Sequence, residues 1–413
     1  MDRRQLLGGM GALAALAQAP ALHAEPGDTL ANIAATVPPI SKVERLERVA
    51  RLQARLRLAG LGAVLIEAGS SLDYFTGIQW WRSERMTAAL IPADGDPLVV
   101  TPFFEAPSIS EMLAVPAEVR TWDEHQDPMA LVAGWLREKR LTHRRFGLEE
   151  TVREFIRAGL QRRLPHLEIV SAAAPVRWVR MRKSPAELAL MRAANTITLN
   201  AMRHAHTRIE RGMGAADVAA LIAGATRAQG GQGDGGLVLL GEASAYPHGS
   251  KQPQRIEEGK VVLLDAGCTV HGYSSDISRT FVFGEAPAAV RKVWNEVHRG
   301  QEVAQEAARV GVTCGAVDDA VRRYYESLGY GPGYRLPGLS HRTGHGIGMD
   351  GHEPVNLVHG EATLIEPGMC FSNEPGIYLP GKFGVRLEDC FHMTESGPRW
   401  FSEPSPSLDK PFG

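Results

Sequence analysis

The first half of the chain alternates between amphipathic helical segments and short apolar runs typical of strands. Apolar residues recur at helical intervals over residues 44–58, with Arg and Glu between them, and Gly60 ends this segment. Because strands and helices alternate, residues 40–178 are expected to form a layered α/β domain. Its last segment, 170–179, is predicted to connect two domains and to end in a strand. The remaining elements predicted in this half are strands at 63–66, 88–91, 98–100 and 146–148 and helices at 129–139 and 151–163.

The second half begins with a strong helix signal. Ser184 is a preferred N-cap, Pro185 suits the first helical position, and Glu187 completes a capping box. This helix is expected to run to about Arg211. We assign residues 179–405 to a second domain. Its other predicted elements are a strand at 237–240 and helices at 216–229, 288–310 and 317–327.

A hairpin carrying two carboxylates is predicted over residues 261–283, which read VVLLDAGCTVHGYSSDISRTFVF. Apolar runs at both ends predict its two strands. Asp265 stands where the first strand ends, and Asp276 stands just before the second. A carboxylate beside an apolar strand is costly unless it is paired or bound to a metal. Asp residues that flank a hairpin are also common turn formers, so these two alone do not define a site.

Three later residues favour a metal site. His345 lies in HRTGHGIG, Glu374 in SNEPGIY and Glu388 in VRLED, each beside a short apolar run. Together with Asp265 and Asp276 they form an oxygen-rich ligand set that suits Mn²⁺, Co²⁺ or Zn²⁺. Four carboxylates in one pocket repel each other, and two dications would neutralise them.

The order of these residues and the motifs around them resemble the pita-bread metallopeptidases of family M24. Within that family the resemblance is to the proline-specific branch, Xaa-Pro aminopeptidase (aminopeptidase P) and Xaa-Pro dipeptidase (prolidase). It rests on DAGC, DISRT, GHGIG, NEPGIY and RLED and covers the chain from about Lys183, and less tightly the N-terminal half. It implies an α/β (α+β) fold, with an N-terminal creatinase-like α/β domain before a C-terminal pita-bread domain.

The resemblance also implies two divalent metal ions. Mn²⁺ is the first choice, with Co²⁺ or Zn²⁺ as alternatives. Asp265 is expected to bind one ion, Asp276 and Glu388 to bridge both, and His345 and Glu374 to complete the other.

Further residues match the family's substrate site. His248, His341 and His352 are expected to contact or place the substrate, with His352 the first candidate for proton transfer or oxyanion stabilisation. Glu374 is expected to accept a proton from the water molecule that the two ions would hold. A hydrogen-bonded pair beside the metals is expected from Tyr378 and Arg386. Plainer alternatives are that His248 is a surface loop residue and that Arg386 only balances nearby carboxylates.

The activity that the resemblance implies is hydrolysis of the Xaa-Pro bond at the N-terminus of short peptides or in Xaa-Pro dipeptides. The proline nitrogen carries no N–H, so such a bond needs a dedicated pocket. Two alternatives stay open: a pita-bread hydrolase of other specificity, acting on phosphotriesters or as a broader aminopeptidase, and a non-catalytic peptide-binding member. The non-catalytic members lose metal ligands, whereas all five are present here.

Composition narrows the partners. The formal net charge of −2 over 413 residues argues against a nucleic-acid partner, because such proteins carry a basic surface. The four cysteines form no CxxC motif, and we expect buried free thiols.

A homodimer is expected from the family, in which the N-terminal domain often leans over a neighbour's pocket. The segment Trp80-Trp81-Arg82 is read as a substrate-facing lip, an interface anchor or core packing.

The N-terminus resembles an export signal. Arg3-Arg4, followed by Leu6-Leu7 and an apolar stretch, is typical of a twin-arginine signal, here assigned to residues 1–24. It implies a periplasmic protein, or a cytoplasmic one if this is an ordinary N-terminus. The apolar stretch is too short and too glycine-rich for a membrane span, so no stable membrane insertion is expected.

Overall fold

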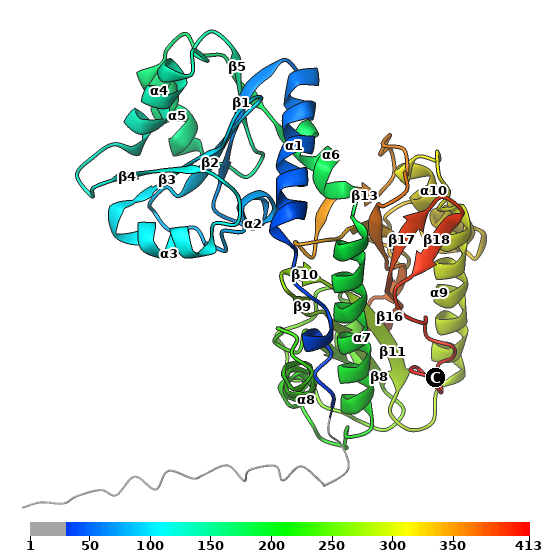
Figure 1. The fold of residues 1–413 in the computed structure, drawn as a ribbon. Coiled ribbons are helices and arrows are strands. Elements are labelled where there is room, and N and C mark those ends of the chain that lie inside the picture. The colour runs from blue at the N-terminus through cyan, green and yellow to red at the C-terminus, as the bar shows by residue number, and fades with distance from the viewer. Residues whose placement is uncertain (1–29) are drawn as a thin grey trace, which may run out of the picture.

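The computed structural model describes residues 30–413 and contains two units joined side by side (Figure 1). Residues 1–29, which hold the predicted export signal, lie outside the described residues. Among the residues described, no helix is both long and apolar enough to cross a bilayer. The predicted fold class is confirmed: an α/β unit precedes a unit of antiparallel sheets and long helices.

The N-terminal unit is a three-layer α/β structure. Its six-stranded sheet has the order β4-β3-β2-β1-β5-β6. Alternate residues of β1 face opposite sides: Val64 and Ile66 pack under α1, α2, α3 and α6, whereas Ala63 and Leu65 pack under α4 and α5. The strands are β1 (Leu61–Glu67), β2 (Ala88–Pro92), β3 (Leu98–Pro102), β4 (Glu118–Trp122), β5 (Arg145–Leu148) and β6 (Ile169–Ser171). The helices are α1 (Lys42–Leu58), α2 (Ser70–Thr76), α3 (Ala106–Met112), α4 (Pro128–Glu138), α5 (Glu154–Arg163) and α6 (Ala173–Met181).

Two boundaries differ from the sequence-based prediction. The strand expected at the end of 170–179 is wrong, because helix α6 begins at Ala173. Pro175 lies in the first turn of that helix, where a missing N–H breaks no intrahelical bond. The helix expected to reach Arg211 ends at His206. The chain after it pairs with another segment instead, since the Gly212 N–H donates to the Ile256 carbonyl at 2.9 Å.

The C-terminal unit holds its strands between two pairs of helices. Its sheets have the orders β11-β8-β7, β10-β9, β13-β12-β14-β17-β18 and β15-β16. The helices are α7 (Pro185–His206), with the predicted capping box, α8 (Ala215–Ala228), α9 (Ala288–Ala307) and α10 (Cys314–Ser327). The strands are β7 (Leu237–Leu240), β8 (Val261–Ala266), β9 (Thr269–Val270), β10 (Tyr273–Ser274), β11 (Ile277–Val282), β12 (Gly344–Gly346), β13 (Glu353–Leu357), β14 (Cys370–Asn373), β15 (Gly376–Leu379), β16 (Phe383–Arg386), β17 (Asp389–Thr394) and β18 (Gly397–Trp400).

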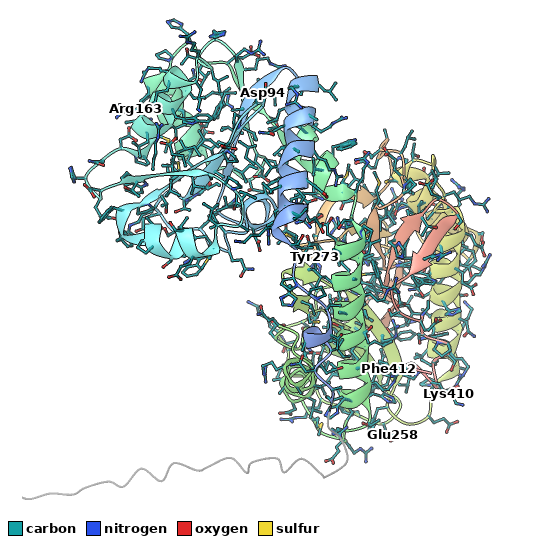
Figure 2. The ribbon with its side chains drawn as sticks, in the orientation of Figure 1. Asp94, Arg163, Glu258, Tyr273, Lys410 and Phe412 are labelled. Carbon is teal, nitrogen blue, oxygen red and sulfur yellow. The ribbon has the colours of Figure 1, made fainter. Side chains whose placement is uncertain are left out.

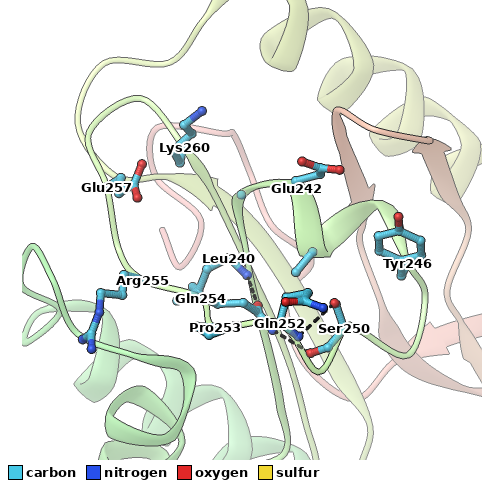
Figure 3. A pocket seen from close by; sticks show the side chains of 12 residues that line it. Leu240, Glu242, Tyr246, Ser250, Gln252, Pro253, Gln254, Arg255, Glu257 and Lys260 are labelled. Carbon is cyan, nitrogen blue, oxygen red and sulfur yellow. Dashed lines mark hydrogen bonds between the residues drawn. The ribbon is translucent and has the colours of Figure 1, made fainter.

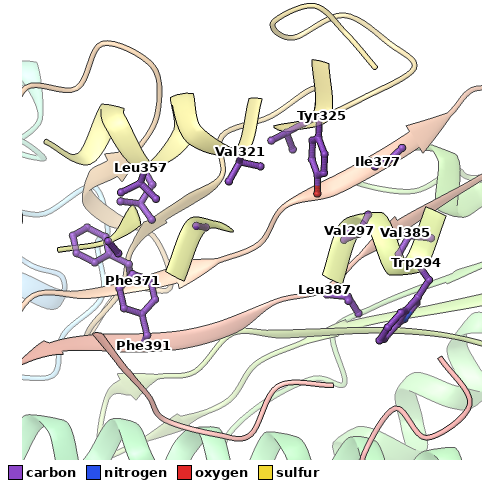
Figure 4. Close-up of a cluster of buried hydrophobic side chains, with 14 of the residues drawn as sticks. Trp294, Val297, Val321, Tyr325, Leu357, Phe371, Ile377, Val385, Leu387 and Phe391 are labelled. Atoms are coloured by element: carbon purple, nitrogen blue, oxygen red, sulfur yellow. The ribbon is translucent and has the colours of Figure 1, made fainter. Parts of the chain in front are cut away.

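The largest core of this unit lies under α9 and α10 (Figure 4). Trp294 and Val297 from α9 and Tyr325 from α10 pack against strand residues that include Val385 and Leu387. On the other side, α7 and α8 cover β7, β8 and β11. The strands are therefore fixed from both faces, which makes their ends a rigid place for a site.

Buried polar groups join the two units. Arg48 of α1 donates to the Tyr273 hydroxyl at 2.9 Å, and that hydroxyl donates to Glu187 of α7 at 3.0 Å. Tyr273 lies where the two units meet (Figure 2). Nearby, Glu353 accepts from Arg180 of α6 and from Lys183 at 2.9 Å. These cations lower the pKa of the fully buried Glu353 to about 2, against the cost of its burial.

Replacing Glu353 by alanine is expected to destabilise the protein by about 3–5 kcal/mol, because it leaves the buried Lys183 without its carboxylate and leaves Arg180 only the half-exposed Asp350 at 2.9 Å. The matched control is Glu366→Ala, whose half-exposed pair with Arg182 lies at the same junction and is worth about 0–1 kcal/mol. Urea unfolding measures both. Equal losses in the two variants would contradict the importance of the buried cluster.

Candidate metal centre

The structure brings the five predicted ligands together, four of them at or next to strand ends and one within a short strand. Asp265 lies near the end of β8, Asp276 directly precedes β11, and His345 is central in β12. Glu374 lies between β14 and β15, and Glu388 lies between β16 and β17. The ligand atoms of Asp265, Asp276 and Glu388 lie within 4.8 Å of one another, and so do those of His345, Glu374 and Glu388. Glu388 thus belongs to both groups, as a residue shared by two ions would.

His345 presents one free nitrogen to the carboxylates. Its Nε2 lies 3.6 Å from Asp276 Oδ2 and 3.6 Å from Glu374 Oε1. Its Nδ1 lies 3.0 Å from the Gly346 carbonyl, which places the proton on Nδ1 and leaves the Nε2 lone pair for a metal. Burial, and then the nearby His352, lower the pKa of His345 to about 3. The ring is therefore neutral at physiological pH, as a metal ligand must be.

The buried, crowded carboxylates favour bound cations, because their negative charges are unfavourable without them. Burial raises the pKa of Asp276 and of Glu388 well above the usual range, and the neighbouring carboxylates raise them further. Burial also raises the pKa of Glu374 to about 7, although Arg386 opposes it. Glu388 Oε1 is buried without a hydrogen-bond partner among residues 30–413, while Ser278 Oγ donates to Oε2 at 2.8 Å. A buried carboxylate oxygen with no donor fits a metal ion.

Arg386 and Tyr378 form the hydrogen-bonded pair expected beside the metals. Arg386 pairs with Asp265, and its NH1 donates to the Tyr378 hydroxyl at 3.0 Å. That hydroxyl lies 2.8 Å from His341 Nε2 and donates to it, since His341 Nδ1 donates to the Arg342 carbonyl at 2.7 Å. Both ring nitrogens of His341 are thus occupied. Burial, and then Arg386, lower its pKa to about 3, so it is a neutral wall of the site.

A cavity of about 500 Å³ opens over the five ligands. His248, His341 and His352 all line it, as expected, and His248 and His352 are exposed at its rim. The His352 ring lies 4.0 Å from the His345 ring. Arg342 also lines the cavity, and its NH2 lies 3.2 Å from His352 Nδ1. Sequence reasoning assigned no role to Arg342, although its position between His341 and His345 was the available signal.

The loop that carries His248 is fixed by Gln254 (Figure 3). Gln254 Oε1 accepts from the Leu240 N–H at 2.8 Å, and its Nε2 donates to the Ser250 carbonyl at 3.1 Å. These residues also line a second cavity of about 350 Å³. The two bonds tie the loop to the end of β7 and so hold His248 at the rim of the metal site.

No cysteine belongs to the candidate ligand groups among the described residues. All four are buried free thiols, as predicted: Cys268, Cys314, Cys370 and Cys390. Burial raises the pKa of Cys370 to about 12, so this thiol is protonated at physiological pH.

Two overlapping, oxygen-rich ligand groups beneath an open cavity are the arrangement typical of a two-metal hydrolase. Comparison with known proteins identifies the family. Residues 189–395 match the model of metallopeptidase family M24, and residues 48–182 match the creatinase/prolidase N-terminal domain. The chain belongs to metallopeptidase family M24, as its motifs predicted.

Individual relatives cover nearly the whole chain. A probable dipeptidase PepE of Mycobacterium tuberculosis is 34% identical over 359 residues, which is 85% of this chain and 92% of the relative. An Xaa-Pro dipeptidase of Lactobacillus delbrueckii is 27% identical over 365 residues, 87% of this chain and 97% of the relative. The crystal structure of dipeptidase PepE from Mycobacterium ulcerans is 30% identical, with a TM-score of 0.80 over 89% of this chain and 97% of that one.

In the metal-free protein, the stability that Glu374 contributes is expected to fall as pH rises through the range set by its pKa. Its pKa is raised from 4.5 to about 7, so between these values the folded state holds a proton that the unfolded chain has released. The contribution of Glu374 to the free energy of unfolding therefore decreases with rising pH in that window, whereas the lowered pKa values of His341 and His345 give contributions that increase with pH up to about 6.5. Asp276 and Glu388 act in the same direction as Glu374.

Added Mn²⁺ should thus raise the melting temperature more at about pH 8, where no proton competes, than at about pH 5. Thermal unfolding with chelator and with Mn²⁺ measures this difference. The control is Glu374→Gln, whose free energy of unfolding without metal should decrease less, or increase more, between pH 4.5 and about 7 than that of the wild type. An unchanged slope in that variant would contradict the assignment to Glu374.

Proposed function

We propose that the protein hydrolyses the Xaa-Pro bond of Xaa-Pro dipeptides and at the N-terminus of short peptides, using two divalent ions bound by Asp265, Asp276, His345, Glu374 and Glu388. The observation that carries the proposal is the convergence of these five side chains beneath a cavity lined by histidine and arginine. The Xaa-Pro dipeptidase among the relatives supports the choice of substrate.

The ions, when bound, supply a water of lowered pKa as the nucleophile. Glu374 lines the cavity beside it and accepts its proton on a carboxylate oxygen. His352, which is not locked by buried contacts, donates to the developing oxyanion or to the leaving nitrogen. Tyr378 and Arg386 hold His341 and Asp265 in place. His248, at the rim, contacts the substrate end that projects from the cavity.

Mn²⁺ is the proposed ion. The ligand set contains four carboxylates and one imidazole. Mn²⁺ is a hard ion and prefers such oxygen ligands to soft ones. Activity restored to chelated protein by Mn²⁺, Co²⁺ and Zn²⁺ in parallel ranks the candidates. A preference for Zn²⁺ at equal occupancy would overturn this choice and leave the two-ion mechanism in place.

A substrate panel tests the activity itself. With Mn²⁺ present, glycyl-proline and glycyl-prolyl-alanine are expected to be cleaved, whereas glycyl-alanine and a phosphotriester should react far more slowly. No turnover of either proline peptide, in protein shown to hold two ions, would exclude the proposal. Faster phosphotriester hydrolysis would instead favour a hydrolase of other specificity.

Arg342 is expected to favour substrates that end in a free carboxylate. Arg386 is already paired with Asp265, whereas no carboxylate pairs with Arg342 in the described part of the chain. A hydrogen bond to a charged group is worth about 1.5–3 kcal/mol, so Arg342→Met should lower kcat/KM for glycyl-proline by about 10–100-fold. Glycyl-proline amide lacks the charge, and its hydrolysis should hardly change. Equal losses on both substrates would contradict this role.

A homodimer is proposed from the family and from one surface feature. Trp81 is 72% exposed and stacks on Trp80, whose ring packs partly against the core, so only Trp80 fits the core-packing interpretation. An exposed aromatic next to Arg82 suits an interface anchor. Sedimentation of the wild type and of Trp81→Asp tests this: a dimer that becomes monomeric supports it, and a monomeric wild type contradicts it.

Periplasmic export is proposed from Arg3-Arg4 and the apolar stretch after it. Fusion of residues 1–29 to a reporter that is active only after twin-arginine export is the test. Export that is lost in an Arg3→Lys, Arg4→Lys variant supports the proposal, and a reporter retained in the cytoplasm would contradict it.

A further inference from the structure

A buried ion pair lies behind the metal ligands, on the side away from the cavity. Arg279 of β11 and Asp389 of β17 are both 0% exposed, and Arg279 NH2 donates to Asp389 Oδ1 at 2.7 Å. Neither side chain lines the cavity. Because a fully buried ion pair gains little net stability after its desolvation, stability alone does not explain its presence.

The pair ties together β11 and β17, the two strands that directly follow Asp276 and Glu388. Arg279 NH1 donates to the Glu388 carbonyl at 2.9 Å and to the Ser278 carbonyl at 3.0 Å. Asp389 directly follows Glu388, and Arg279 follows Asp276 by three residues in the same segment. A movement of the segment that holds Arg279 away from the segment Glu388–Asp389 must therefore break or stretch these bonds.

Gln301 of α9 connects this ion pair to β14, the strand that directly precedes a third ligand, Glu374. Its Nε2 donates to Asp389 Oδ2 at 3.0 Å and to the Asn373 carbonyl at 3.3 Å. In return, Asn373 Nδ2 donates to the Gln301 carbonyl at 3.0 Å. Asn373 directly precedes Glu374, and Gln301 is 2% exposed. One buried glutamine thus connects the backbone before Glu374 with the side chain after Glu388.

We propose that Arg279, Asp389 and Gln301 are positioning residues that set the spacing of the metal-binding carboxylates Asp276, Glu374 and Glu388. The inference rests on the proposed two-ion site. Carboxylates crowded in one pocket repel one another, and strand ends that are free to separate would relieve that repulsion. The bonds among the three residues oppose this separation, and so keep the carboxylates close enough to share cations.

Metal affinity, rather than activity, tests the proposal. Residues that hold metal ligands from behind are typically worth 10–100-fold in affinity. Gln301→Met and Asp389→Asn keep the shape of each side chain, so both are expected to fold and to bind Mn²⁺ at least about tenfold more weakly by calorimetric titration. The matched control is Val297→Ala, one turn earlier on the same helix and equally buried, which removes packing but none of these bonds.

The expected result is weaker binding of Mn²⁺ in both test variants and unchanged binding in the control. Unchanged affinity in Gln301→Met and Asp389→Asn, or an equal loss in Val297→Ala, would overturn the proposal. So would a control that folds while both test variants do not, since the three residues would then only support folding. A wild type that binds two ions but cleaves no proline peptide would refute the proposed function and leave this inference standing.

Discussion

Replacing Asp276 by alanine is expected to abolish activity and metal binding together. Asp276 Oδ2 lies 3.6 Å from His345 Nε2, and Asp276 also groups with Asp265 and Glu388, so its carboxylate touches both halves of the candidate site. A bound metal contributes several kcal/mol to the transition state, and its loss should lower kcat/KM by about 10³-fold or more. Elemental analysis and glycyl-proline hydrolysis, measured on the same preparation, check both parts.

The control for this variant is Asp94→Ala, an exposed carboxylate of the N-terminal unit (Figure 2). It should keep two ions and full activity. Retention of both ions by Asp276→Ala would show that Asp276 does not bridge them. Loss of ions with full activity retained would be more serious, because it would separate the chemistry from the metal site.

His352→Ala is expected to keep both ions and lose rate. His352 lies within reach of Asp276 and His345, so its position alone does not distinguish a ligand from a proton donor. Its Nδ1 faces the Arg342 guanidinium at 3.2 Å, and the side chain is exposed at the cavity rim, which favours contact with substrate. Loss of a positioned proton donor costs about 10²–10⁴-fold in kcat.

The readouts for this variant are kcat and the metal content of the purified protein. The matched control is His359→Ala, since His359 is exposed and pairs with Asp319 at 2.7 Å away from the cavity. If His352→Ala loses an ion, His352 is a ligand and the proton must come from elsewhere. If it keeps both ions and its full rate, His352 has no catalytic role.

The elements that were predictable from sequence are those whose signal is local. The capping box of Ser184 and Glu187 fixes the start of α7 whatever the rest of the chain does. Strict alternation likewise placed Val385 and Leu387 in the core and Arg386 with Glu388 in the polar site.

The errors and omissions depend on contacts between distant segments. Residues 173–181 form a helix rather than a strand because their apolar face packs against α1 and the N-terminal sheet. The length of α7 is limited by pairing of Gly212 with Ile256. Only the family motifs predicted that the five ligands converge. Neither composition nor the spacing of residues specifies how separate strand ends meet.

The supporting residues were harder to foresee. Arg279, Gln301 and Asp389 resemble ordinary charged or polar positions in the sequence, and only the folded chain shows that all three are buried behind the ligands. Arg342 stands between two expected site histidines, but its side chain direction depends on the loop that Asp318 fixes through Thr343 at 2.7 Å.

The most direct test is a titration of chelated, metal-free protein with Mn²⁺, in which bound metal and glycyl-proline hydrolysis are followed together. We expect two ions bound per chain and activity that saturates as the second equivalent binds. Full hydrolysis without metal, or an active protein whose five ligand side chains bind no ion, would contradict the two-metal peptidase site.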